Sequence, residues 1–182
     1  KPDIESAGAD PVIDSEGNVY FSTYEGELVA LNASDGSVRW TFQDTSGYKG
    51  TKFVDGYSIT ILSNNDVVYP AGDLYCFDNN GAEKWRSPFK SYMSTTLGNN
   101  NILYGWGGYN EDNPESSLFA INASNGEILS TKLSTLDIDL LSLVPPLSID
   151  HQGNLVAVGL KKIHCITSLS NSLEESGWSK LG

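Results

Sequence analysis

Residues 28–32 of the chain read LVALN, and strands of the same kind recur as LYCFD at 74–78, LFAIN at 118–122 and IHCIT at 163–167. These apolar strands begin 46, 44 and 45 residues apart. A repeat of about 45 residues that contains several short strands is the sequence signature of a β-propeller blade. The chain is therefore predicted to be a run of four blades.

The segment before each of these strands repeats as well. IDSEGNVYF from Ile13 matches IDHQGNLVA from Ile149, three repeats later, with LSNNDVVYP and LGNNNILYG at the places between them. Each segment holds a Gly or Asn where a tight hairpin needs a positive φ angle. These turn dipeptides are Gly17-Asn18, Asn65-Asp66, Asn100-Asn101 and Gly153-Asn154.

A second turn follows the apolar strand in three of the repeats and leads into an outer strand. The turns are Ser34-Asp35-Gly36, Asn79-Asn80-Gly81 and Ser124-Asn125-Gly126, and the outer strands read SVRWTF, AEKWRS and EILSTK. No segment shows a sustained apolar period of about 3.6 residues. We predict an all-β fold, a propeller of about four-stranded antiparallel blades, in one segment 1–182 with repeats at about 8–50, 51–91, 92–134 and 135–182.

The second turn and the outer strand resemble the docking motif of the pyrroloquinoline quinone (PQQ)-type propellers, A-x-D-x-x-T-G-x-x-x-W. The first repeat reads ALNASDGSVRW from Ala30 to Trp40, and the second reads CFDNNGAEKW from Cys76 to Trp85. The third repeat has Ser130 in the place of the tryptophan, and the fourth keeps only its strand.

The resemblance implies a structural role for the motif residues. Trp40 and Trp85 would pack between neighbouring blades, because a large flat ring fills the wedge between twisted sheets. Gly36, Gly81 and Gly126 would permit the tight turns.

PQQ-type propellers usually close with seven or eight blades, so the resemblance implies that four blades are part of a larger ring. An open stack would leave apolar faces and strand edges unpaired. Either the sequence is a fragment of a longer chain, or two chains associate as a homodimer with eight blades. The abrupt start at Lys1 and end at Gly182 favour the fragment.

The charge balance narrows the range of partners. The chain has 11 basic and 23 acidic side chains, for a net charge of −12. Binding of nucleic acid requires clustered Lys and Arg, so we expect no nucleic-acid partner. No apolar run approaches the roughly 20 residues of a membrane span, so we expect none.

The two cysteines occupy one column of the repeat. Cys76 and Cys165 stand where the other repeats have Ala30 and Ala120, a column that favours small side chains. Their blades are separated by the third blade, and a disulfide needs Cα atoms within about 7 Å. We predict two free, buried thiols.

One acidic insertion, at residues 107–115, lengthens a loop of the third repeat. Its oxygen-bearing residues Asn110, Glu111 and Asp112 are weak candidates for a calcium site, because the alternating order of a known calcium loop is missing. The same loop is a candidate partner contact through Trp106, Tyr109 and Glu111.

No catalytic constellation stands out. Asp137 and Asp139 lie on one side of an extended segment, which usually indicates a solvated strand face. His151 belongs to a surface turn and His164 to a strand, and two isolated histidines make no metal set. We predict no catalytic, cofactor-binding or resident metal site.

In character, the chain is most similar to the non-catalytic periplasmic scaffold propellers that take part in outer-membrane assembly. The resemblance implies a periplasmic or extracellular scaffold that binds protein partners, or the remaining propeller blades, through loops and blade edges. One alternative is the C-terminal part of a PQQ-dependent quinoprotein dehydrogenase, with PQQ and calcium as cofactors. Against it, the chain has no adjacent Cys-Cys pair and about a third of the expected length. A second alternative is a sensor or adhesin module.

Overall fold

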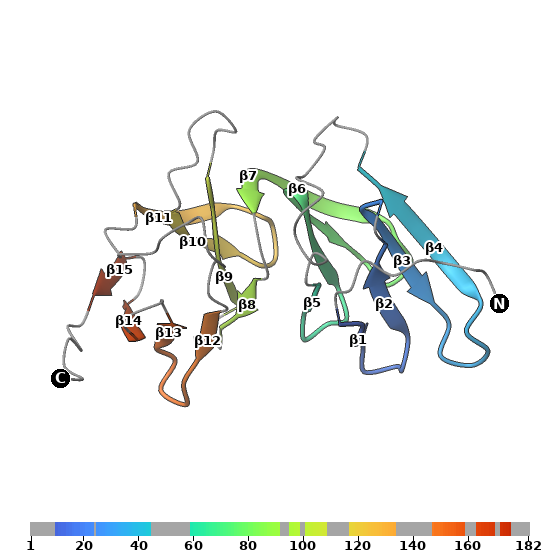
Figure 1. Cartoon of the computed structure of the whole chain (residues 1–182), viewed down its shortest axis with the longest axis horizontal. Helices are drawn as coiled ribbons and strands as arrows, with labels where there is room; N and C mark the ends of the chain where they lie inside the picture. Colours follow the sequence, from blue (N-terminus) through green and yellow to red (C-terminus); the bar gives the residue numbers. More distant parts are fainter. Residues whose placement is uncertain are drawn as a thin grey trace. The chain divides into compact units, whose positions relative to one another are not determined.

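The computed structural model describes residues 10–23, 25–44, 59–91, 95–98, 101–108, 117–133, 147–158, 163–169 and 172–175. The regular structure in these ranges consists of β-strands in antiparallel pairs, which confirms the predicted all-β class (Figure 1). Within the same ranges, no helix is long and apolar enough to cross a membrane. The chain divides into two compact units, residues 1–92 and residues 93–182.

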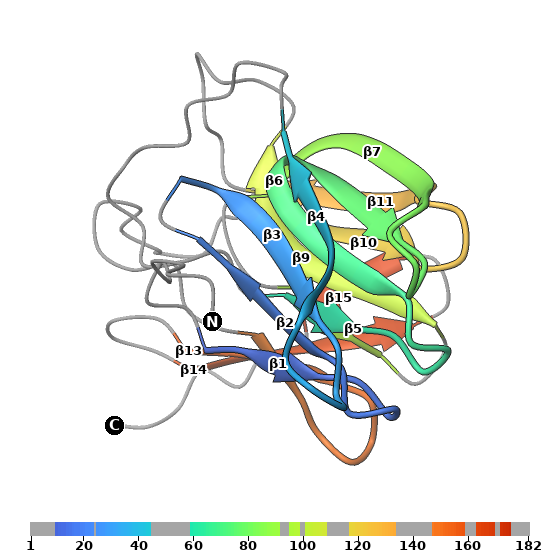
Figure 2. The same cartoon turned by 90° about the vertical axis from the view of Figure 1, so that its right-hand side faces the viewer.

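The first unit begins with a four-stranded antiparallel sheet, called here the first sheet. Its strands are β1 (Val12–Ile13), β2 (Val19–Ser22), β3 (Glu27–Leu31) and β4 (Val38–Gln43), and they lie side by side in chain order (Figure 2). Half-buried and buried residues alternate along β2, which is the pattern of a strand with two different faces.

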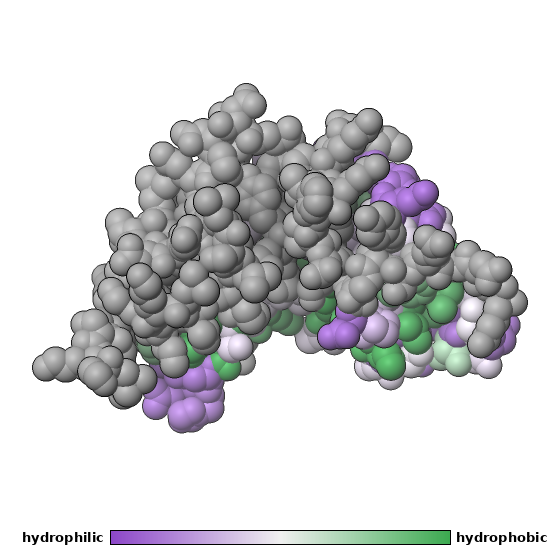
Figure 3. All heavy atoms as spheres, in the orientation of Figure 1, coloured by the Kyte–Doolittle hydropathy of each residue, from purple (hydrophilic) through white to green (hydrophobic). Residues whose placement is uncertain are grey.

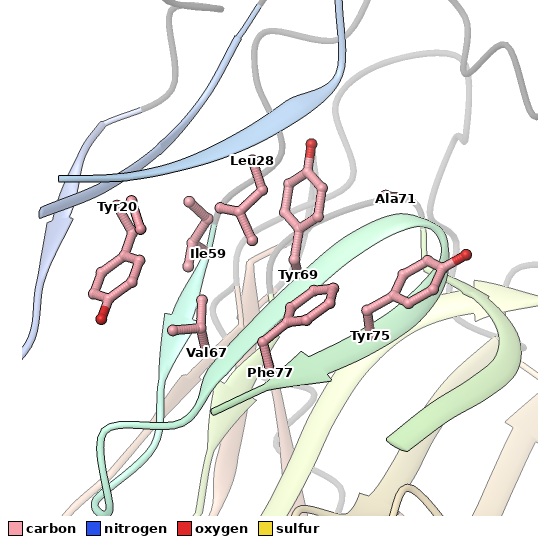
Figure 4. Packing of buried hydrophobic residues seen from close by; sticks show 9 residues of the cluster. Tyr20, Leu28, Ile59, Val67, Tyr69, Ala71, Tyr75 and Phe77 are labelled. Carbon is pink, nitrogen blue, oxygen red and sulfur yellow. The ribbon is translucent and has the colours of Figure 1, made fainter. Parts of the chain in front are cut away.

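The second sheet of the first unit consists of β5 (Thr60–Ile61), β6 (Val67–Phe77) and β7 (Glu83–Ser91). β5 and β7 both pair with β6. Within β6, Gly72 has a φ angle of 81°, and Figure 4 shows the ribbon curving back near Ala71. β5, the two arms of β6 and β7 thus fill the four places of a blade.

The second unit contains two further antiparallel sheets. The third sheet has β8 (Thr96–Leu97), β9 (Ile102–Gly108), β10 (Ser117–Asn122) and β11 (Ile128–Leu133). The fourth sheet has β12 (Leu147–Ile149), β13 (Leu155–Val158), β14 (Ile163–Leu169) and β15 (Ser172–Glu175).

The first turn of each repeat has the same conformation in all four sheets. Positive φ angles occur at Gly17 (86°), Asn65 (65°), Asn101 (60°) and Gly153 (87°), as the turn chemistry predicts. In each case this residue donates its N–H to the carbonyl three residues earlier. Asparagine tolerates the left-handed region better than other residues with a side chain, which explains its use at two of these places.

The second turn is followed by the same strand register in three sheets. Ala30 faces Trp40, Cys76 faces Trp85, and Ala120 faces Ser130. Immediately after each pair the register shifts through a β-bulge. A bulge increases the local twist of the strands, so the repeated motif twists these three outer strands at the same place.

Two apolar clusters form the cores of the units. In the first unit, Tyr20, Leu28 and Ala30 of the first sheet pack against side chains of the second sheet (Figure 4). The members from the second sheet include Val67, Tyr69, Tyr75 and Phe77, all at most 2% exposed. The cluster of the second unit includes Tyr104, Trp106, Leu118, Ala120, Leu147 and Leu155.

Candidate functional site

The outer strand β4 of the first sheet is a strand edge. It pairs with β3 from Glu27↔Gln43 to Leu31↔Val38, and among the described residues it pairs with no other strand. No described strand therefore occupies its outer side, which is the side where an extended segment could pair. We treat β4 and its surroundings as the candidate site.

Trp40 holds β4 against the second sheet. Its indole Nε1–H donates a hydrogen bond of 3.0 Å to the carbonyl oxygen of Asn79, in the turn after β6. The ring also lies directly on Gly81. A Cβ atom at Gly81 would lie 2.7 Å from Cγ and 2.8 Å from Cδ2 of the tryptophan, closer than real Cβ contacts allow. The glycine therefore serves close packing as well as its φ angle of 85°.

Aromatic contacts extend this attachment along β4. The ring of Trp40 lies 5.8 Å from the ring of Tyr20 and 5.8 Å from that of Phe77. Phe42, two residues further along β4, lies 4.6 Å from Phe77 and 4.8 Å from Tyr75. Tilted pairs at such distances contribute about 0.5–1.5 kcal/mol each beyond their burial. The inner face of β4 is thus fixed by aromatic packing.

Three of the four remaining side chains of β4 are exposed to solvent. Val38 is 42% exposed, and Thr41 and Gln43 are also exposed. Gln43 donates a weak hydrogen bond of 3.3 Å from Nε2 to the carbonyl oxygen of Glu25. β4 therefore combines a rigid inner face with a solvent-exposed outer side.

Two charged pairs lie on the second sheet. Lys84 pairs with Asp66, and this hydrogen bond raises the pKa of the lysine. Arg86 pairs with the buried Asp73, and its guanidinium carbon lies 5.0 Å from the centroid of the Tyr75 ring. The hydrogen bond to Asp73 raises the pKa of Arg86. These charges are engaged within the sheet, so they hold strands rather than present free reactive groups.

Two tyrosine–aspartate hydrogen bonds hold segments next to the site. The hydroxyl of Tyr20 donates to Oδ2 of Asp14 at 2.9 Å, and that of Tyr75 donates to Oδ1 of Asp44 at 3.0 Å. Burial, together with the bonded carboxylate, raises the pKa of both phenols. Asp44 directly follows β4, so the second bond fixes the end of that strand.

Asp14 also stabilises the first turn. Burial alone would raise the pKa of its carboxyl group, but hydrogen bonds from Asn18, Tyr20 and the backbone of Glu16 together lower it. Asp150 receives the equivalent bonds from Asn154 and Gln152 in the fourth sheet, and they lower its pKa too. The carboxylate at this place is therefore a turn-forming group.

The adjacent turns of the first and second sheets are also connected. Ser15 donates from its backbone N–H, at 3.2 Å, and from its hydroxyl, at 2.9 Å, to Oδ1 of Asn65. Together with the Trp40–Gly81 contact, this bond links the two sheets at their turns as well as through the apolar core.

The docking residues of the sequence motif take the following places. Gly36, Gly81 and Gly126 have φ angles of 69°, 85° and 73°. Trp85 is 7% exposed and faces Cys76 across the strand pair. Of the five residues, the described contacts bring Trp40 and Gly81 together directly.

The predicted partner-contact and calcium residues lie elsewhere. Trp106 is 1% exposed and packs in the core of the second unit, which argues against a surface role for its side chain. Alternating aromatic and glycine residues along β9 were the available sign of a buried strand face. Tyr109, Asn110, Glu111 and Asp112 are outside the described residues, as are Asp137 and Asp139.

The cysteines differ from each other in burial. Both thiols are free, as predicted, but only Cys76 is buried, whereas Cys165 is half-buried. The expectation of two buried thiols is thus wrong for Cys165, which lies opposite Val156 of β13, a residue that is also half-buried. Burial raises the pKa of Cys76 to about 12, so its thiolate is scarce at neutral pH.

The histidines were the remaining candidates, and within the described residues they belong to no cluster of metal-binding side chains. His151 is exposed in the turn between β12 and β13, as predicted. No group of three or more His, Cys, Asp or Glu side chains gathers within the described ranges.

Comparisons with known proteins connect the fold to two kinds of propeller. Residues 3–85 match the family model of the outer membrane protein assembly factor BamB. BamB from Moraxella catarrhalis is 17% identical, with a TM-score of 0.59 over 87% of this chain and 45% of that one. Quinohemoprotein alcohol dehydrogenase from Comamonas testosteroni is 16% identical, with a TM-score of 0.61 over 90% of this chain and 29% of that one.

A third solved structure has a similar fold at lower sequence identity. The WD40 domain of Pan2 from Neurospora crassa is 11% identical, with a TM-score of 0.63 over 96% of this chain and 51% of that one. No curated protein sequence matches the chain. The chain spans less than half of the BamB and dehydrogenase chains, and at these identities the solved structures establish the propeller fold alone.

Proposed function

We propose that this chain, whose residues 3–85 match the BamB family model, is a PQQ-like β-propeller and a non-catalytic scaffold that binds protein partners outside the cytoplasm. The matching family model is named for outer membrane protein assembly, and it covers residues 3–85. This segment contains the whole first sheet and therefore β4. A periplasmic or extracellular location is part of the same proposal.

The observation that carries the proposal is the combination of an open strand edge and a rigid attachment. Trp40 and Phe42 fix the inner face of β4, while the described residues supply no strand for its outer side. An edge that is already held in the extended conformation loses little conformational entropy when a partner strand pairs with it. Such an edge favours the addition of an extended segment from another protein.

The side chains of β4 would then select among partners. In strand addition, backbone hydrogen bonds supply affinity and the alternating side chains supply selectivity. Val38 offers an apolar contact, whereas Thr41 and Gln43 offer polar ones. The net charge of −12 favours the encounter with partners that carry positive charge.

Site-specific photo-crosslinking tests this proposal. A photoreactive amino acid is placed at Thr41 or Gln43 of β4, or at the exposed turn residue Asp35 as a matched control. The chain is then irradiated in an extract of the cells that make it. We expect both β4 positions to capture the same protein and Asp35 to capture much less of it. Equal capture at all three positions, or none at β4, would exclude β4 as the binding edge.

The dehydrogenase alternative is tested separately. The full chain is mixed with PQQ and calcium, and the near-ultraviolet absorbance and the oxidation of alcohols or sugars with an artificial electron acceptor are measured. A scaffold neither retains the quinone nor supports the oxidation. Stoichiometric quinone binding with turnover would replace the scaffold proposal by the enzyme.

A further inference from the structure

We propose that Asn80 is a site of spontaneous deamidation, and that its isoaspartate product loosens the attachment of β4 to the second sheet. The inference is independent of the partner binding proposed for β4, because the reaction needs only this chain and water. It follows from the sequence Asn80-Gly81, from the hydrogen bonds of the second turn and from the contact between Gly81 and Trp40.

Asparagine is a thermolabile residue, and a following glycine promotes its deamidation through a cyclic imide. The main-chain nitrogen of Gly81 loses its proton and forms a bond to Cγ of Asn80, and the side-chain amide nitrogen leaves as ammonia. Glycine favours this ring closure because it has no Cβ atom to hinder the approach. Water then opens the imide. Opening at Cγ gives aspartate in a normal backbone, whereas opening at the main-chain carbonyl carbon gives isoaspartate.

Three turns of the chain place such a pair at the same point of the repeat. The pairs are Asp35-Gly36, Asn80-Gly81 and Asn125-Gly126. In each turn the glycine donates its N–H to the carbonyl of an earlier turn residue, at 2.9 Å, 3.0 Å and 2.9 Å respectively. The attacking nitrogen is therefore held to the same degree in all three turns. A difference in reactivity must come from the side chain before the glycine.

This side chain is hydrogen-bonded in the first and third of the turns. Oδ1 of Asp35 accepts a bond of 2.9 Å from the N–H of Ser37. Oδ1 of Asn125 accepts a bond of 3.0 Å from the N–H of Glu127. Cγ of either residue can turn towards the glycine nitrogen only when this bond breaks. The bond therefore opposes ring closure.

The side chain of Asn80 is not held in this way. Its turn is one residue shorter, and Asp78 accepts the N–H groups of the turn instead, from Asn80 at 2.8 Å and from Ala82 at 2.9 Å. The Asn80 side chain makes no hydrogen bond to any residue in the described ranges. It is exposed, in a unit whose described surface is hydrophilic in part (Figure 3). Of the two Asn-Gly pairs in the chain, this one therefore closes the imide ring more easily.

Isoaspartate at position 80 disturbs the contacts of Trp40. It adds one carbon atom to the main chain between position 80 and Gly81. The carbonyl of Asn79, which accepts the indole N–H, precedes this link, and Gly81, on which the ring lies, follows it. The fit is tight, since a Cβ atom at Gly81 would already lie 2.7 Å from the ring. One of the two contacts must loosen, whereas aspartate keeps the native backbone and both contacts.

The rate of deamidation tests the site. The native chain is incubated in a mildly alkaline buffer made with water enriched in heavy oxygen, which marks the bonds hydrolysed during the incubation. Peptides that contain Asn80 or Asn125 are then quantified by mass spectrometry. One lost hydrogen bond corresponds to a factor of roughly 2–10, so we expect Asn80 to react about 2–10 times faster than Asn125. In urea, where neither turn is folded, the two rates should converge.

Hydrogen exchange of β4 tests the consequence. The isoaspartate form is isolated from the aged chain by chromatography and compared with Asn80→Asp, which carries the same charge on a native backbone. We expect the amides of β4 to exchange about 2–10 times faster in the isoaspartate form. Aged Asn80→Gln is the matched control. Glutamine would have to close a six-membered ring, which is much slower, so β4 should exchange as in the fresh chain.

Either measurement can overturn the proposal. If Asn125 reacts as fast as Asn80 in the native chain, the free side chain does not determine the site. If Asn80 reacts in urea but not in the native chain, the hydrogen bond of Gly81 protects it. If β4 exchanges equally in the isoaspartate form and in Asn80→Asp, the attachment of Trp40 does not depend on this link.

Discussion

Replacing Gly81 by alanine should destabilise the first unit far more than replacing Gly36, although both glycines end the same turn. The left-handed backbone alone costs alanine about 1–2 kcal/mol relative to glycine, and this cost is common to both variants. At Gly81 the new Cβ would also lie 2.7 Å from Cγ of Trp40, so the indole must move. At Gly36 no atom lies within 4 Å.

The displacement of Trp40 sets the additional cost. The indole would lose its 3.0 Å hydrogen bond to Asn79, worth about 0.5–1.5 kcal/mol. It would also weaken its contacts with Tyr20 and Phe77, which contribute about 0.5–1.5 kcal/mol each. We expect a loss of about 3–5 kcal/mol for Gly81→Ala and about 1–2 kcal/mol for Gly36→Ala.

Urea unfolding followed by tryptophan fluorescence measures both free energies. With a slope of about 1–3 kcal/mol per molar urea, the two variants should differ in midpoint by roughly 1 M. A double-mutant cycle with Trp40→Ala tests this cause. In the Trp40→Ala background, Gly81→Ala should lower the free energy of unfolding no more than Gly36→Ala does, because no ring remains to be displaced. Equal destabilisation by the two glycine substitutions, or an unchanged cost without Trp40, would refute the packing described here.

Three further outcomes can be checked with simple assays. Trp40→Phe keeps an aromatic ring but removes the N–H donor to Asn79, so the free energy of unfolding should fall by about 1–3 kcal/mol, and a loss below 0.5 kcal/mol would count against that bond. The lowered pKa of Asp14 means that its contribution to stability is present above the pKa of the unfolded chain and is lost as the pH falls through the lower folded value. Asp14→Asn should therefore reduce the fall in the free energy of unfolding below about pH 4, and an unchanged fall would contradict this role of Asp14. In the native chain, Ellman's reagent should label Cys165 well before Cys76, whose pKa is raised to about 12, and equal rates would show that Cys76 is not buried.

Much of the repeat architecture can be predicted from local sequence. Turn chemistry and strand alternation act over a few residues, so the positive φ angles at Gly17, Asn65, Asn101 and Gly153 follow from the residue types. The small residue in the column of Ala30 also follows from the repeat. The reason for a small residue there appears only in the strand register, where Ala30 lies opposite Trp40 on the neighbouring strand.

The candidate site was harder to predict. The acceptor for Trp40 is the backbone carbonyl of Asn79, and every residue has such a carbonyl, so no side-chain pattern indicates it. For Trp106, the sequence suggested a surface role that its burial does not support. An aromatic residue next to an irregular loop suggested a partner contact, but it is 1% exposed because it points into the core of its own unit.

The sequence by itself determined the strands, the turns and the period of this protein, because those features depend on backbone preferences and on side chains close together in the chain. It also placed Gly36 and Gly81 at the same point of the repeat, each with a positive φ angle. Only the tertiary structure separated the two glycines. Trp40 covers Gly81 and no atom lies near Gly36, since coverage depends on which sheet packs against which face.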